Sequence, residues 1–250
     1  MPSHIADISV IIPALNEREN LSLLLPLLKE VLGDLHLTSE VIVVDGRSDD
    51  GTREVAARWG AQVVTQKSRG YGGALISGFE AATAPFMVTM DADLSHPPVF
   101  LADFWQHRNE AEIIIGSRYV RGGSADMSKF RLLLSLVLNA VCRRLLAFSI
   151  RDLSSGFRMY QCSAVRARTF QARDFDILEE ILVKAHVDGC RILEVPFRYG
   201  ARRSGNSHIR LLRFGWSFIK TLKRMRDLRF REKRIWDKNQ RTTFSNEEQD

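Results

Sequence analysis

Two aspartates separated by one residue are the strongest chemical signal in this sequence. Asp91 and Asp93 follow the apolar run 86–90, which predicts a buried strand. Two carboxylates at one strand end repel each other unless a positive charge lies beside them. A divalent cation that carries a diphosphate would supply that charge, because hard cations prefer oxygen ligands. An aspartate-rich turn is the structural alternative, and the pair alone does not decide between them.

Polar side chains also follow the other apolar runs. They are Asn16 and Glu17 after 8–13, Asp45 after 41–44, and Arg118 at the end of 112–118. In an open parallel sheet, ligands bind beyond the carboxyl ends of the strands. Carboxylates and a guanidinium gathered at that edge suit a divalent cation and a phosphorylated ligand. For Asp45, a plain turn is again the alternative.

The elements that must position these side chains alternate along the chain. We expect strands at 8–13, 41–44, 61–66, 86–90, 112–118 and 191–199, and helices at 19–35, 52–59, 74–82 and 129–148. This alternation predicts an α/β fold with a Rossmann-like, mainly parallel sheet and helices on both faces. Gly70, Gly72 and Gly73 do not match the GxGxxG spacing of dinucleotide sites, so that function is disfavoured.

The composition is that of a globular protein, with 45% hydrophobic and 26% charged residues in a chain of 250. The net charge is +6, but the segment from Arg202 to Arg234 has a surplus of ten positive charges, which leaves −4 for the rest. Such a patch can meet anionic lipid or phosphorylated substrates. Nucleic-acid binding is not expected, because no recognition motif accompanies the patch.

The sequence predicts no membrane span. The longest uncharged stretch in the second half, Leu132 to Cys142, has eleven residues, whereas a transmembrane helix needs about 20. The amino terminus places Asp7 where a secretory signal has basic residues. Cys142, Cys162 and Cys190 lack the spacing of a disulfide framework or a zinc site. These features predict a cytoplasmic protein with reduced thiols.

A series of motifs in a fixed order covers about residues 7–208. They are DISVIIPALNEREN, VIVVDGRSDDGT, RGYGGALISGFEAA, MDADLSHPP, IIIGSRYVRGG and SSGFRMY. Together they resemble the family 2 glycosyltransferases, and among these the polyprenyl-phosphate sugar transferases related to dolichyl-phosphate mannose synthase. The resemblance implies a GT-A fold, a GDP- or UDP-sugar donor, Mg²⁺ or Mn²⁺, and inversion at the anomeric carbon.

The resemblance also implies the residues of the donor site. Matching positions are Pro13, Leu15 and Glu17 for the base and ribose, Val43 and Asp45 for the base, and Asp91, Ala92 and Asp93 for the DxD motif that holds ribose, metal and diphosphate. Ser95 stands where the family often has a glutamine that binds the metal, and a water molecule is the alternative ligand there. Arg202 and His208 fall on an RxxGxSK motif, with His208 in place of the lysine, and would contact the donor diphosphate.

On the acceptor side, the resemblance places a lipid phosphate against Arg118, Arg131 and Ser135. Arg131 and Ser135 stand four residues apart and share one face of the predicted helix. A phosphate monoester is already anionic near pH 7, so it needs no general base to remove a proton. Glu180 matches a recurring family glutamate, and both a structural and a functional role remain open for it, with the neighbouring Glu179 as a further candidate.

The predicted protein is therefore an inverting, metal-dependent hexosyltransferase that uses a polyprenyl phosphate. We expect a catalytic domain over 1–208, a basic amphipathic helix over 209–236 that contacts an anionic membrane, and a disordered tail over 237–250. The enzyme would lie on the cytoplasmic face of the membrane, and whether a small membrane subunit anchors it is open. The alternatives are a soluble acceptor with the same donor chemistry, and a non-catalytic protein that binds a nucleotide sugar or a lipid head group.

Overall fold

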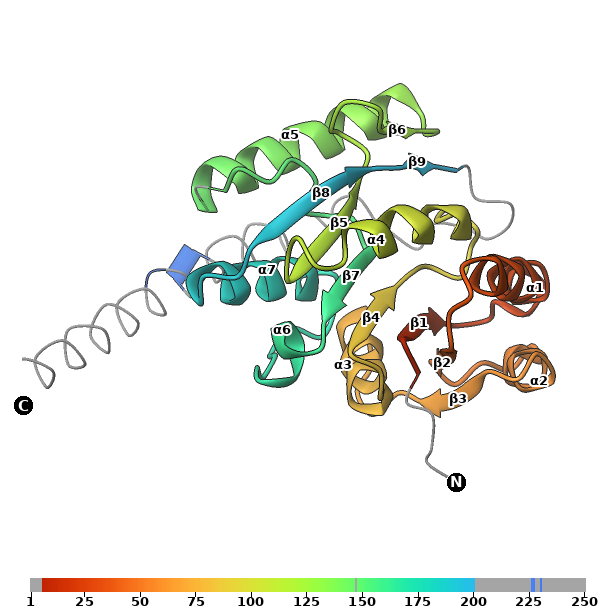
Figure 1. Cartoon of the computed structure of the whole chain (residues 1–250). Coiled ribbons are helices and arrows are strands. Elements are labelled where there is room, and N and C mark those ends of the chain that lie inside the picture. Colours follow the sequence, from red (N-terminus) through yellow and green to blue (C-terminus); the bar gives the residue numbers. More distant parts are fainter. Residues whose placement is uncertain (1–5, 147, 201–225, 228–229, 231–250) are drawn as a thin grey trace, which may run out of the picture.

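The computed structural model describes residues 6–146, 148–200, 226, 227 and 230 (Figure 1). The expected tail 237–250 lies outside the described residues, and so does nearly all of the expected helix 209–236. Arg202 and His208 lie outside them as well.

The core of the described structure is a seven-stranded sheet with the strand order β3-β2-β1-β4-β7-β5-β8. Its strands are β1 (Ile8–Ala14), β2 (Ser39–Asp45), β3 (Gln62–Thr65), β4 (Phe86–Thr89), β5 (Ile113–Ser117), β7 (Arg158–Gln161) and β8 (Ile192–Pro196). A short pair, β6 (Ser124–Ala125) and β9 (Arg198–Tyr199), forms a second sheet. Within the large sheet, β7 runs antiparallel to β4 and β5, and the other pairs are parallel.

The mainly parallel sheet expected from the sequence is confirmed, with two differences. The pattern of RMYQ in β7 contains no β-branched residue and begins with an arginine, so the sequence does not predict this strand. The strand expected at 191–199 divides into β8 and β9. β8 ends at Pro196, which has no N–H to extend the pairing. The chain then changes its partner, because β8 pairs with β5 whereas β9 pairs with β6.

The helices are α1 (Arg18–Asp34), α2 (Thr52–Arg58), α3 (Tyr71–Ala81), α4 (Leu101–His107), α5 (Lys129–Leu146), α6 (Ser163–Arg166) and α7 (Ile177–Val187), with a 3₁₀ turn at Pro98–Phe100. The four helices expected from the sequence are present, whereas α4, α6 and α7 are additional. Pro26 lies inside α1 without ending it. A proline inside a helix costs about 3 kcal/mol, and the buried leucines of α1 offset that cost by packing on the sheet.

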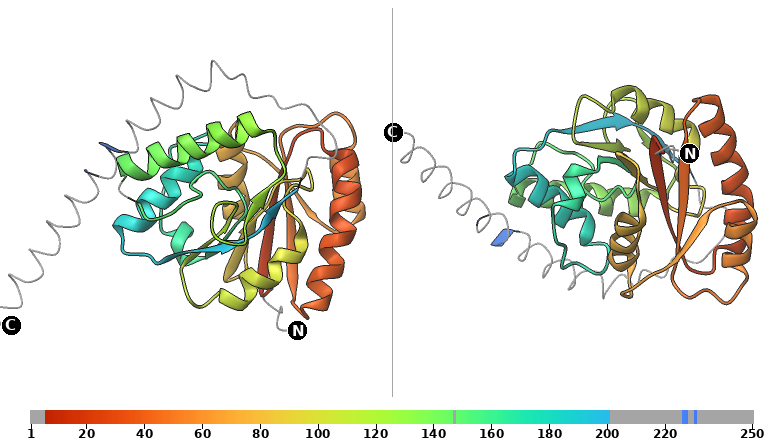
Figure 2. Two further views of the ribbon diagram at one scale, coloured as in Figure 1. Left: turned by 90° about the horizontal axis from the view of Figure 1, so that it is seen from above. Right: turned by 60° about the horizontal axis from the view of Figure 1, so that its bottom comes forward.

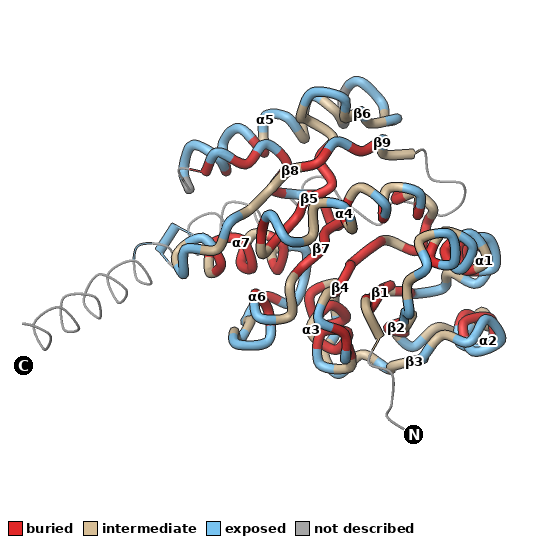
Figure 3. Tube along the Cα trace, in the orientation of Figure 1, coloured by how far each residue is buried: buried red, intermediate tan, exposed pale blue. Residues whose placement is uncertain are grey.

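The helices form two layers around the sheet (Figure 2). Buried side chains of α1, α2 and α4 pack on one face, and those of α3, α6 and α7 pack on the other. Strand β1 supplies both layers, because Ile8, Val10 and Ile12 belong to the first cluster and Ile11 belongs to the second. The buried positions therefore run through the centre of the molecule along β1 and β4 (Figure 3).

We predict that Gly78→Ala lowers the free energy of unfolding by about 1–3 kcal/mol, measured by urea denaturation. A Cβ at Gly78 would lie 2.3 Å from Cγ2 of Ile11, so α3 would have to move away from β1. Gly33→Ala in α1 is the matched control, because nothing lies within 4 Å of its added Cβ. Alanine favours the helix there, and we expect a gain of about 0.5–1 kcal/mol. A Gly78→Ala protein as stable as the wild type would contradict the tight contact of α3 with β1.

Candidate active site

The turns that follow β1, β2 and β4 meet at one edge of the sheet. The parallel register sets Ala14 opposite Asp45, and the N–H of Met90 donates to the carbonyl of Ile11. Within the described residues, left-handed backbone at a non-glycine position occurs in all three turns, at Asn16, Arg47 and Leu94, and elsewhere at His36. Such strained conformations are costly and concentrate at functional sites. This edge of the sheet is therefore the candidate active site.

Asp45 is fully buried at the end of β2, where the turn begins. Its carboxylate accepts hydrogen bonds from the backbone N–H groups of Arg47 and Ser48, each at 3.1 Å. The guanidinium of Arg53 also lies 3.2 Å from Oδ2 of Asp45. Asp45 thus holds the turn together, which is the structural role that the sequence left open.

The other positions expected to meet the nucleotide differ in their accessibility. Leu15 is exposed, Pro13 and Glu17 are half-buried, and Val43 is fully buried in the core between the sheet and α1. The carboxylate of Glu17 accepts a hydrogen bond from Asn20 at 2.5 Å. A ligand at this edge could therefore reach Leu15 directly, whereas the side chain of Val43 lies beneath the surface.

The two carboxylates after β4 lie in different surroundings. The side chain of Asp91 is 28% exposed, and Asp93 is 7% exposed. Ser95 is fully buried, and both its N–H and its hydroxyl donate to Oδ1 of Asp93, at 3.1 and 2.5 Å. The buried Ser95 thus orients the Asp93 carboxylate through two hydrogen bonds.

Asp91 is positioned by two aromatic residues. The backbone N–H of Asp91 donates to Nδ1 of His96 at 2.9 Å, so the neutral imidazole carries its hydrogen on Nε2. Burial lowers the pKa of His96, although the nearby Asp91 opposes this effect, and the ring stacks on Phe157. The Tyr71 hydroxyl points to Oδ1 of Asp91 at 3.5 Å, and its ring stacks on Phe175. Burial raises the pKa of Tyr71 well above its usual value, so the phenol keeps its proton.

The described residues contain no group of three or more His, Cys, Asp and Glu side chains that could hold a metal ion by themselves. Asp91 and Asp93 fit a cation that also takes ligand oxygens and water. Mg²⁺ is commonly held in this way, by one or two carboxylates together with the phosphates of a substrate.

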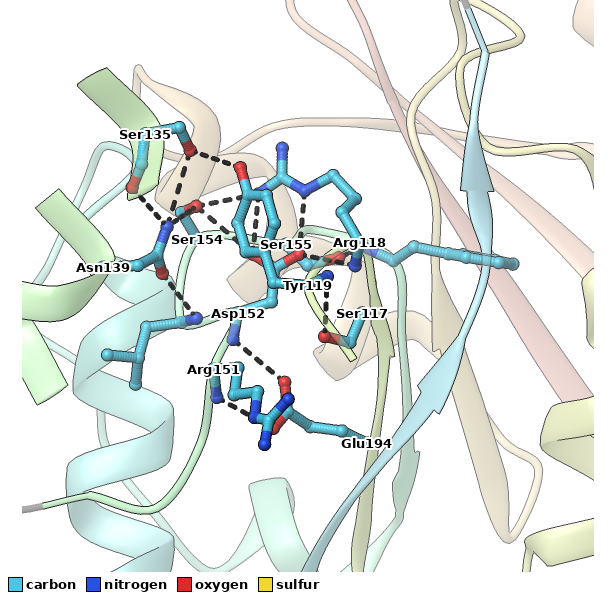
Figure 4. A network of polar contacts seen from close by, with 12 residues as sticks. Ser117, Arg118, Tyr119, Ser135, Asn139, Arg151, Asp152, Ser154, Ser155 and Glu194 are labelled. Carbon is cyan, nitrogen blue, oxygen red and sulfur yellow. Dashed lines mark hydrogen bonds and ion pairs between the residues drawn. The ribbon is translucent and has the colours of Figure 1, made fainter. Parts of the chain in front are cut away.

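A second polar cluster lies beyond β5 (Figure 4). Arg118 forms a two-point ion pair with Asp152, with Nε at 2.8 Å from Oδ2 and Nη2 at 2.6 Å from Oδ1. The Arg118 side chain is only 11% exposed, and Nη2 also donates to Ser154 at 2.9 Å. Burial tends to lower the pKa of the Arg118 guanidinium, but its hydrogen bonds to Asp152 outweigh this and raise it. Arg118 therefore stays charged, and Asp152 balances that charge.

Helix α5 joins this cluster through Ser135. The Tyr119 hydroxyl donates to Oγ of Ser135 at 2.7 Å. The amide of Asn139 donates to the Ser135 carbonyl at 2.9 Å and to Ser154 at 3.2 Å (Figure 4). Arg131 belongs to α5 by its backbone, and its side chain is outside what the structure describes.

The loop 152–156 connects the two clusters. At its start, the N–H groups of Arg151 and Asp152 donate to the Glu194 carboxylate of β8, at 2.8 and 2.9 Å. At its end, a Cβ added to Gly156 would lie 3.6 Å from Oδ1 of Asp91 and 2.6 Å from the Tyr71 hydroxyl. Only glycine permits this approach, so the loop brings the Arg118 cluster next to the carboxylate pair.

Glu180 makes contacts that support the structural role, one of the two that the sequence left open. It is almost fully buried, and its carboxylate accepts the N–H groups of Gln171 and Ala172 and pairs with Lys184. Burial alone would raise the pKa of Glu180, but these hydrogen bonds lower it. The glutamate thus fixes the segment that approaches the amino end of α3.

The glycines before and in α3 serve close packing. A Cβ at Gly72 would lie 2.9 Å from the Ala172 carbonyl oxygen, and one at Gly70 would lie 2.2 Å from the carbonyl oxygen of Arg173. The segment 172–174 therefore rests directly on this backbone. This packing explains why glycines stand at these positions, and no dinucleotide-binding role is needed to explain them.

Several residues of the site carry no signal in the sequence. Asp152 lies 34 residues from Arg118. Tyr119 follows Arg118 directly and Asn139 stands one helical turn after Ser135, but their contacts across the cluster arise from the packing of α5 against the loop 152–156. His96 follows Asp91 and Asp93 in the sequence, and this proximity is the one available hint of its role.

Residues 9–169 match the family described as glycosyl transferase family 2. The chain is 37% identical over 213 residues to a dolichol-phosphate mannosyltransferase of Pyrococcus furiosus, a match that covers 81% of this chain and 59% of that protein. It is also 34% identical over 215 residues to an undecaprenyl-phosphate mannosyltransferase of Micrococcus luteus, and this match covers 79% of this chain and 85% of that protein. The chain thus spans less than two thirds of the first relative.

Among solved structures, the chain resembles glucosyl-3-phosphoglycerate synthase of Mycobacterium tuberculosis, crystallised with Mn²⁺, UDP and glucosyl-3-phosphoglycerate. The TM-score is 0.68 at 21% identity, and the match covers 88% of this chain and 80% of that one. At this identity the likeness shows the fold, and the GT-A fold expected from the sequence is confirmed.

We predict that His96→Phe lowers the free energy of unfolding by about 1–3 kcal/mol in urea denaturation. Phenylalanine keeps the stack on Phe157 but leaves the N–H of Asp91 without its acceptor. His107→Phe is the control, because the backbone carbonyl that its ring contacts belongs to its own helix. Equal stabilities of His96→Phe and the wild type would show that Asp91 does not depend on this hydrogen bond.

We predict that the Glu179 carboxyl destabilises the folded protein as the pH rises from about 5 to 8. Burial raises its pKa from 4.5 to about 7, with Arg158 opposing and Asp176 reinforcing the effect. The folded state then binds more protons than the unfolded state across this interval, so stability falls as pH rises. Glu179→Gln should reduce the decline of the urea midpoint with rising pH, whereas Glu30→Gln, at an exposed position, should leave that decline unchanged. Parallel curves for the wild type and Glu179→Gln would refute the assignment.

Proposed function

Because the chain belongs to glycosyl transferase family 2, we propose that it transfers a hexose, mannose or glucose, from a GDP- or UDP-sugar to a polyprenyl phosphate with inversion at the anomeric carbon. The observation that carries this proposal is the loop 152–156. It sets a guanidinium cluster that suits a phosphate beside a carboxylate pair that suits a metal-bound diphosphate.

On the donor side, Asp91 and Asp93 would hold Mg²⁺ or Mn²⁺, which neutralises charge on the leaving diphosphate when bound. Ser95 keeps one oxygen of Asp93 engaged, so the other side of that carboxylate is the one offered to the ion. His96 and Tyr71 fix Asp91 from its backbone and its side chain. We assign the leaving diphosphate to Arg202 and His208 from the family resemblance, and contact with the base and ribose to Pro13, Leu15, Glu17, Val43, Asp45 and Ala92.

On the acceptor side, Arg118, Arg131 and Ser135 would orient the phosphate toward the anomeric carbon. Asp152 holds the Arg118 guanidinium in one plane through two hydrogen bonds, which reduces the entropy lost when a phosphate binds. The acceptor oxygen is already anionic near neutral pH, so no residue has to remove a proton from it.

The acceptor lipid requires contact with a membrane surface. No helix within the described residues is long and apolar enough to cross a bilayer. Helix α5, which carries Ser135, exposes a row of large apolar side chains, namely Leu133, Leu136, Val137, Val141 and Leu145. Arg143 and Arg144 lie exposed in its last turn. This combination suits an interfacial helix on an anionic membrane, which we place at the cytoplasmic face. A small membrane subunit as an additional anchor is compatible with this arrangement.

The test is release of nucleoside diphosphate from GDP-mannose or UDP-glucose in the presence of Mn²⁺, with and without a short polyprenyl phosphate. Release that depends on the lipid supports the proposal. Release that requires a soluble phosphorylated acceptor instead would favour the alternative acceptor class, and no release with any acceptor would favour a binding protein.

In this assay Asp93→Ala should reduce turnover by about 100-fold or more, because the diphosphate loses its stabilised cation. Ser135→Ala should raise the KM for the lipid phosphate while the KM for the nucleotide sugar stays unchanged. The exposed Asp34→Ala in α1 is the control for loss of a single acidic charge. An Asp93→Ala protein with wild-type turnover would rule out the metal assignment.

A further inference from the structure

A cavity of about 590 Å³ lies between α3 and the segment 165–173. Helices α3 and α6 lie side by side on the same face of the sheet (Figure 1). The cavity includes none of the candidate active-site residues, and its volume is within the range of small-molecule sites, about 300–1,000 Å³.

Basic side chains dominate the charge around this cavity. Lys67, Arg166, Arg168 and Arg173 line it, and Glu80 is the one acidic residue in the lining. Lys67 pairs with Glu80 at 2.5 Å, and Arg168 pairs with Asp188 at 2.6 Å. Within the described residues, Arg166 and Arg173 have no carboxylate partner, and Arg166 donates only to the Ala82 carbonyl. Arg166 and Arg173 thus line the cavity without a carboxylate partner among the described residues.

The rest of the lining is apolar. Phe79 and Val165 are buried, and Ile76 and Phe170 are half-buried beside them. Guanidinium groups match the oxygens of a phosphate, and aromatic and aliphatic side chains match a hydrocarbon or ring. We propose that this cavity binds a small organic phosphate, with its phosphate at Arg166 and Arg173 and its apolar part against Phe79 and Phe170.

The cavity shares a wall with the candidate active site. The carbonyl of Arg173 accepts the N–H of Gly73 at 3.1 Å, and Phe175 stacks on Tyr71 two residues further along. Tyr71 in turn contacts Asp91. The ligand would therefore lie behind the segment that supports Asp91. The proposal concerns binding alone and does not depend on the proposed transfer reaction.

The test measures binding of phenyl phosphate and inorganic phosphate to the full chain by titration calorimetry in EDTA. Without a metal, Asp91 and Asp93 repel anions, so the donor site contributes little. The charge-reversal variants described next separate binding in this cavity from binding at the proposed acceptor site of Arg118. We expect phenyl phosphate to bind more tightly than inorganic phosphate. Equal affinities would overturn the apolar half of the site, and no binding of either probe would overturn the whole proposal.

Charge reversal locates the site. Arg173→Glu, alone or with Arg166→Glu, should weaken the binding of phenyl phosphate by about tenfold or more. This is the change in affinity expected when one charged hydrogen bond is lost. Arg58→Glu and Lys29→Glu are the controls, because they change the net charge equally at exposed positions of α2 and α1. The side chain of Arg173 makes no hydrogen bond to the described residues, so this variant should fold. Equal weakening in the control variants would show adventitious binding through net charge.

Discussion

Two carboxylates in close succession at the end of β4 impose the constraint on which the rest of the structure depends. Removing charges from water costs several kcal/mol for each ion, and Asp93 is nearly buried. The protein compensates with hydroxyl donors, since Ser95 donates to Asp93 and Tyr71 points to Asp91. His96 fixes Asp91 from the other side by accepting its backbone N–H. The remaining demand for positive charge is what makes this edge of the sheet suited to a cation and its phosphate ligand.

The same edge explains why the chain between β5 and β7 takes the path that it does. Antiparallel β7 lies between β4 and β5, so the loop 152–156 before it must return to the end of the sheet where the parallel strands stop. Glu194 and Asn139 hold the start of this loop, and Gly156 allows its end to approach Asp91. The loop before this inserted strand thus joins the Arg118 cluster to the carboxylate pair.

Much of the fold is predictable because its signals are local. Buried parallel strands are continuous β-branched runs, and helices α1, α3 and α5 have apolar residues at helical spacing. β7 escapes prediction because pairing on both sides, and not its sequence, makes it a strand. The division of 191–199 into β8 and β9 likewise depends on which neighbour each half meets, although Pro196 marks the place.

For the site, residue type and position in the sequence by themselves pointed to a carboxylate pair and to Arg118 at one edge of the sheet, whereas the role of Ser135 rested on the family resemblance. Only the tertiary structure decided how those groups are paired. It showed Asp152 as the partner of Arg118, the hydroxyl of Ser95 engaged with Asp93, and Val43 and Asp45 beneath the surface. The physical reason is that burial and hydrogen-bond partners depend on contacts between residues far apart in the chain, which no local pattern records.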